Sequence, residues 1–136
     1  MPGPRSSVPP SRSPFAYATV RVVPDIEREE FLNSGLILYS RVKSFLRAAT
    51  WLDEAALAAL RPDSDVAGIR EQLRFVESVA DGALTAAPFG TMTQSERFHW
   101  LTTPRSTLVQ PGPLHTGTSD DPEATFTHLF GLLVRR

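Results

Sequence analysis

The chain has 136 residues, of which 12 are proline and none is cysteine, and its formal net charge is −1. These values exclude a collagen-like protein, a disulfide-stapled protein and a Cys-ligated zinc or iron–sulfur site, and they are typical of one domain with its own hydrophobic core. A nearly neutral chain also lacks the overall positive field that draws a protein to nucleic acid or to an anionic membrane.

The N-terminal residues 1–14 are rich in proline and serine and contain almost nothing to bury. We expect them to form a disordered tail, followed by a single domain over residues 15–136. The tail lacks the ~7–15 apolar residues of a signal peptide, and the chain lacks the ~20 apolar residues of a membrane span. We therefore expect a cytoplasmic protein that does not enter a membrane.

The first part of the domain is predicted to be mostly strand. Alternating large and small side chains predict a strand with Tyr17 and Arg21 on one face. Asp25, followed by several glutamates, favours one or two helical turns. The expected elements are a strand over 15–23, helical turns over 26–31, a turn at 33–35, a buried strand over 36–39 and its hairpin partner within 41–50.

Three helices are expected in the rest of the chain. Asp53 caps a helix over 54–60, and Asp63 or Ser64 caps one whose apolar residues repeat at helical spacing from Val66 to Ala80. The last helix starts at Asp121-Pro122-Glu123, which combines a cap, a first-turn proline and a first-turn acid.

Residues 94–117 form the candidate functional segment, because polar and titratable side chains gather there around expected short strands. These strands are predicted at 99–102 and 106–110. Binding and catalytic residues concentrate in such turns and strand ends. The candidates in this segment are Glu96, Arg97, His99, Arg105, Ser106, Gln110 and His115.

The first hypothesis for the segment is anion binding. Arg97 and Arg105 could grip a phosphate or carboxylate bidentately, and the Ser106 hydroxyl could assist. Arg21 could join them from the first strand. The alternative is that the arginines pair with acids or backbone carbonyls and only fix the turn. The residues proposed for anion binding are Arg21, Arg97, Arg105, Ser106 and His115, with Glu30, Asn33, Glu96 and Gln110 as supporting residues.

The second hypothesis is acid–base catalysis by His99 and His115, because histidine titrates near neutral pH. Such a pair would cleave a phosphoester, with one imidazole accepting a proton and the other donating one. Each histidine precedes a threonine by three residues, whereas two-histidine phosphoesterases place the hydroxyl two residues on. The alternative is a pair of hydrogen-bonded structural histidines, which we favour.

Metal, cofactor and nucleic-acid sites are not expected. The spacing of Glu96, His99 and His115 matches no compact metal-ligand motif, and no glycine-rich loop follows the first strand to hold a nucleotide cofactor. Phe98 and Trp100 could stack on bases, but few basic residues accompany them, which favours a place in the core.

Two blocks of the sequence resemble a bacterial family of unknown function, the DUF 3037 group. The first block contains Val-Arg-Val-Val-Pro-Asp and Glu-Phe-Leu-Asn-Ser-Gly, followed by an apolar strand. The second contains Ser-Glu-Arg-Phe-His-Trp, Pro-Arg-Ser-Thr and Gln-Pro-Gly-Pro-Leu-His-Thr-Gly. The resemblance covers residues 15–134 and implies no established reaction or cofactor. It does imply a regulatory or accessory role beside a HipA-like kinase, by association.

Together these observations predict an α+β fold, with an antiparallel or mixed sheet of about four to five strands and about three helices packed mainly on one face. The leading functional prediction is a non-catalytic regulatory or accessory domain. It would bind a partner protein or a small anionic ligand through residues 94–117 and Arg21. The runner-up is a phosphoester-cleaving enzyme that uses His99 and His115.

Overall fold

Two long antiparallel strands form the centre of the structure, a computed structural model that describes residues 11–135. β1 (Ser13–Asp25) pairs with β2 (Glu30–Ser40), and β2 pairs with β3 (Phe45–Thr50), as the predicted hairpin requires. A 3-10 helix, Ile26–Arg28, connects β1 to β2. Most of the predicted tail lies outside the described residues, but its last two residues, Ser13 and Pro14, belong to β1.

The other edge of β1 is shared by two short strands. β4 (Val109–Pro111) pairs with β1 near the β1–β2 turn, and β5 (His115–Ser119) pairs with the opposite end of β1. All pairings in this five-stranded sheet are antiparallel. The strand count agrees with the prediction, and the arrangement explains why β1 is the longest strand.

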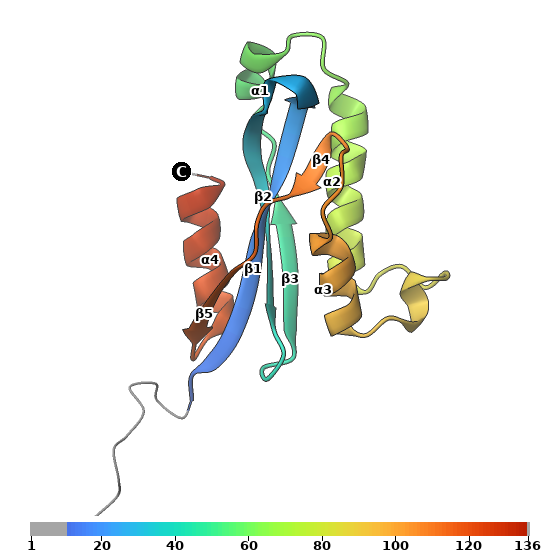
Figure 1. Ribbon diagram of the computed structural model, residues 1–136. Coiled ribbons are helices and arrows are strands. Elements are labelled where there is room, and N and C mark those ends of the chain that lie inside the picture. Colours follow the sequence, from blue (N-terminus) through green and yellow to red (C-terminus); the bar gives the residue numbers. More distant parts are fainter. Residues whose placement is uncertain (1–10, 136) are drawn as a thin grey trace, which may run out of the picture.

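Four α-helices cover the two faces of the sheet (Figure 1). Three of them, α1, α2 and α3, pack on one face, and α4 packs alone on the other. The structure therefore confirms the α+β class, with one helix more than expected. The helices are α1 (Glu54–Leu60), α2 (Val66–Asp81), α3 (Gln94–Thr102) and α4 (Pro122–Leu133). No helix within residues 11–135 has the length and apolarity needed to cross a membrane.

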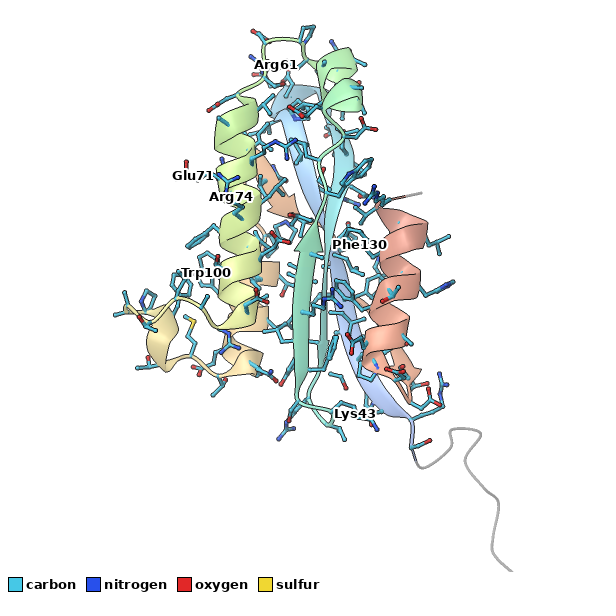
Figure 2. All side chains as sticks on the ribbon, turned by 180° about the vertical axis from the view of Figure 1, so that it is seen from behind. Lys43, Arg61, Glu71, Arg74, Trp100 and Phe130 are labelled. Carbon is cyan, nitrogen blue, oxygen red and sulfur yellow. The ribbon has the colours of Figure 1, made fainter. Side chains whose placement is uncertain are left out.

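The alternation of β2 produces two cores. Ile37 joins the larger cluster with α1, α2 and α3, whereas Leu36 and Leu38 join the smaller cluster with Phe126 of α4. Figure 2 shows Phe130 of α4 on this smaller side as well. Successive side chains of a strand point to opposite faces, so a run of three apolar residues requires cover on both.

The helix ends follow ordinary capping chemistry. The side chain of Asp65, not of Asp63 or Ser64, accepts a hydrogen bond from the backbone of Gly68 and starts α2. Gly82 ends α2 in the left-handed conformation. Asp121 caps α4, as predicted.

Residues 94–102 correct the prediction of a strand over 99–102, because they form α3. Thr93 and Glu96 make a reciprocal capping box: each side chain accepts a hydrogen bond from the other's backbone N–H. A 3-10 helix, Phe89–Thr91, precedes α3.

Two other parts of the chain also differ from the predicted elements. The strand expected over 106–110 is shorter and later, as β4, and β5 follows it. The helical turns expected over 26–31 end at Arg28, and the turn expected at 33–35 lies inside β2.

The turn-like residues at 33–35 form a β-bulge. Val20 pairs with Gly35 and Arg21 pairs with Asn33, so that Ser34 is the extra residue of β2. A bulge leaves one residue outside the regular ladder and re-aims the side chains beside it. This bulge lies within the part of the sheet that carries the candidate site.

Candidate functional site

A row of three polar side chains crosses the sheet at the bulge. Arg21 of β1 lies opposite Asn33 of β2 on one side and opposite Gln110 of β4 on the other. Val20 and Val22 point into the larger core, so Arg21 points to the face that carries α4. The sheet extends past the C-terminal end of α4 toward the β1–β2 turn (Figure 1). We call Arg21, Asn33 and Gln110 the polar row.

Arg21 borders a hollow of about 340 Å³ at this end of the sheet. Its guanidinium carbon lies 3.9 Å from the centre of the Phe31 ring, and Phe31 is 43% exposed. Stacking of this kind holds a guanidinium flat and leaves its N–H edge for hydrogen bonds. The hollow is lined by Arg21, Val23, Ile26, Glu29, Glu30, Phe31 and Gln110.

Buried polar atoms without a hydrogen-bond partner gather at the same place. Within residues 11–135 there are four such side-chain atoms, and three of them belong to Arg21 (Nε), Asn33 (Oδ1) and Ser34 (Oγ). Most buried polar groups in folded proteins are hydrogen-bonded, because an unpaired one costs stability. Three on adjacent positions therefore mark a place where a bound group would find partners.

Two arginines of the predicted site serve another purpose. Arg97 donates a hydrogen bond to the Met92 carbonyl at 3.1 Å. Arg105 donates to the carbonyls of Trp100 and Thr103 and stacks on the Trp100 ring at 4.4 Å. These contacts match the alternative in which the arginines fix the backbone. Arg97 belongs to α3, and Arg105 lines a small hollow on the α3 side of the sheet together with Gln110.

Other candidates also have local structural roles. Glu96 is exposed and belongs to the α3 capping box, where hydrogen bonds from the backbone N–H and then the hydroxyl of Thr93 lower its pKa. Glu30 lines the Arg21 hollow and pairs with Arg28. Ser106 is exposed in the segment between α3 and β4.

The two histidines lie on opposite sides of the sheet. His99 is exposed on α3, which packs with α2 over the larger core. His115 begins β5 and stacks on the Tyr17 ring, with 5.2 Å between ring centres, and Tyr17 packs against the smaller core. The hydroxyl of Thr102 donates to the Phe98 carbonyl within α3. The structure does not bring the histidines into one cleft, which the catalytic hypothesis requires.

The structure therefore brings together a subset of the predicted residues. Arg21, Asn33 and Gln110 form the polar row, and Glu30 lines the hollow beside Arg21; among these residues, only Gln110 comes from the 94–117 segment. Sequence reasoning missed Phe31 and Ser34 as parts of this site. Phe31 could have been found from the sequence, because it is an aromatic residue that follows an acidic stretch. It also stands two positions before Asn33, which places both side chains on the same face of a strand.

A comparison with protein families gives a match. The family described as "Protein of unknown function (DUF3037)" matches residues 17–134, which is nearly the whole chain. No curated protein and no solved structure matches.

Proposed function

The chain belongs to the DUF3037 family, and on that premise we propose that it is a non-catalytic regulatory or accessory domain that binds a carboxylate of a partner protein through Arg21. The proposal keeps the anion-binding role expected from the sequence. It moves the centre of the site from residues 94–117 to the polar row.

One observation carries the proposal: the Arg21 side chain donates no hydrogen bond within residues 11–135, whereas Arg97, whose Nε is likewise buried and unpaired, and Arg105 both donate to backbone carbonyls. A guanidinium edge held by a stacked ring offers two parallel N–H groups to a carboxylate. No acidic oxygen lies within 4.0 Å of Arg21 in the part of the chain that the structure describes. Because Nε is buried, the terminal N–H groups of Arg21 are the ones available to an external acceptor.

The surrounding charge favours a protein-borne carboxylate over a free anion. Asp25, Glu27, Glu29 and Glu30 lie around the β1–β2 turn, and Arg28 is the one basic residue among them. These negative charges repel a free anion, and the repulsion is strongest for a dianion such as phosphate. A carboxylate on a partner with neighbouring basic groups avoids that repulsion. Exposed Ile26 and Phe31 offer apolar contact beside it.

The partner itself remains a prediction. A HipA-like kinase is the candidate that the family association offers, and a cytoplasmic location is the compartment in which the two would meet. We expect neither nucleic acid nor a membrane as partner.

The test uses calorimetry to measure the affinity for a HipA-like kinase that is encoded beside a family member. The affinities of the wild-type protein and of the Arg21→Gln variant are compared. We expect at least a tenfold loss of affinity, since a charge-assisted pair contributes about 1.5–3 kcal/mol. Arg74→Gln is the matched control, because Arg74 is exposed on α2 on the other side of the sheet (Figure 2). Unchanged binding by Arg21→Gln would refute the site.

A second measurement separates a partner from a free anion. Acetate, citrate and phosphate are titrated into the wild-type protein. Tight, Arg21-dependent binding of one of them would replace the partner carboxylate with a small ligand. The proposal also predicts no turnover of model phosphoesters, with or without His99 and His115.

A further inference from the structure

A second hollow lies on the same face, on the other side of Phe31. It has a volume of about 480 Å³ and lies between β2, the start of α1 and the C-terminal end of α4. Phe31 lines both hollows, so they are neighbours. The residues that matter for its chemistry are Asn33, Ser34, Trp51, Asp53 and Val134.

Three side chains of this hollow carry hydrogen-bond acceptor atoms, and two of them, Ser34 and Asn33, also carry donors. Ser34 is 1% exposed, and its Oγ has no hydrogen-bond partner within residues 11–135. The buried Oδ1 of Asn33 also has none. Asp53 uses Oδ1 to accept from the Ala56 N–H at 3.0 Å, which leaves Oδ2 and a formal negative charge beside the hollow.

Two further features favour a positive charge there. α4 ends at Leu133, which lines the hollow with Val134, and the C-terminal end of a helix carries partial negative charge. Trp51 offers an aromatic face that already attracts a cation, since the chain's own Arg135 guanidinium lies 5.5 Å from the centre of that ring, and a bound cation would compete with it there. No lysine or arginine lines the hollow among the residues that the structure describes.

We propose that this hollow binds an organic cation, a primary ammonium or guanidinium group that donates to Ser34 and Asn33 and pairs with Asp53. A metal ion fits less well, because Asp53 is the one carboxylate present and residues 11–135 contain no cluster of three metal-ligating side chains. The inference goes beyond the carboxylate site at Arg21, since it concerns the opposite charge and a different hollow.

The test uses the two tryptophans of the chain, each of which gives one indole N–H signal in a proton–nitrogen NMR spectrum. Butylammonium and agmatine are titrated into the full chain, with uncharged butanol as the control ligand. We expect a saturable shift of the Trp51 signal with both cations. The Trp100 signal, on the α3 side, should stay in place.

Asp53→Asn is the decisive variant. Asparagine caps a helix about as well as aspartate, so the substitution keeps α1 and removes the charge. We expect at least a fivefold weaker affinity for both cations. Asp65→Asn is the matched control, because Asp65 caps α2 in the same way and does not line the hollow. Arg21→Gln removes a positive charge beside Asn33, so it should not weaken cation binding although it weakens carboxylate binding, which separates this proposal from the carboxylate site.

The source of the cation is resolved by one more probe, the capped peptide acetyl-Gly-Arg-Gly-amide. Tighter binding of the peptide than of agmatine assigns the hollow to a basic side chain of a partner, and the reverse assigns it to a free amine. Three results would each overturn the proposal: no shift of Trp51, an equal shift with butanol, or equal affinities of Asp53→Asn and Asp65→Asn.

Discussion

At the scale of single residues, Ser34 is buried without a hydrogen bond, whereas Ser40 on the same strand is buried with one. The Ser34 side chain is 1% exposed and its hydroxyl is unpaired. Ser40 lies on the same strand and is equally buried, but its hydroxyl donates to the Pro14 carbonyl at 3.2 Å. The two serines therefore differ mainly in whether a hydrogen bond compensates burial.

We predict that Ser34→Ala raises the free energy of unfolding by about 1 kcal/mol, because it removes a buried polar group that has no partner. Ser40→Ala should lower it by about 1 kcal/mol, because it leaves a carbonyl without its donor. Urea unfolding at constant m-value measures both changes. If Ser34→Ala were as destabilising as Ser40→Ala, the Ser34 hydroxyl would have a partner in solution.

The same residues show how far sequence reasoning reached. Arg21, Asn33 and Gln110 were each named from the sequence, but as members of a site centred on residues 94–117. Their alignment depends on the strand register, and the bulge at Ser34 shifts that register by one residue. Bulges are set by tertiary packing around a strand, so alternation in the sequence could not place this one.

At the scale of elements, helices with clear caps and apolar spacing were predicted well. The bounds of α1 agree with the prediction, and α4 begins at the predicted cap. α3 was missed although its signal was present: Thr93 and Glu96 have the spacing of a capping box. The β-branched and aromatic residues after His99 outweighed that signal. β5 was missed because its threonine- and glycine-rich sequence contains no apolar alternation.

At two glycines, substitution by alanine is expected to change the stability in opposite directions. A Cβ on Gly35 would lie 2.9 Å from the Ala49 carbonyl oxygen and 3.0 Å from Val20, between the central strands. Gly131 lies in α4, and a Cβ there would meet no atom within 4 Å. We expect Gly35→Ala to destabilise by about 1–3 kcal/mol through overpacking. Gly131→Ala should stabilise by about 0.5–1 kcal/mol, because alanine favours the helix.

Thermal or urea unfolding checks both glycine variants in parallel. If the two substitutions changed the free energy of unfolding equally, the prediction would be wrong, because it expects crowding at Gly35 and open space at Gly131 to give opposite changes. A stable Gly35→Ala protein would also show that the bulge next to it can relax.

At the scale of the whole molecule, one sheet separates two cores of unequal size. The larger contains 13 buried hydrophobic residues beneath α1, α2 and α3, whereas the smaller contains four beneath α4. Free energy of local opening scales with the apolar contacts that an element must break. α4 should therefore open before α2. Because the C-terminal end of α4 forms one wall of the hollow of about 480 Å³, the stability of α4 should affect the proposed cation binding there.

We predict that Phe126→Ala increases the difference in local opening between α4 and α2. Phe126 is 2% exposed and anchors α4 to the sheet, and removal of a buried phenylalanine costs about 3–5 kcal/mol. Hydrogen exchange should accelerate strongly in α4 and little in α2. Leu73→Ala, in the larger core, should instead accelerate exchange throughout the sheet. The loosened α4 of Phe126→Ala should also weaken cation binding at the hollow and leave Arg21-dependent binding intact. Uniform acceleration in both variants would show that the two cores unfold as one unit.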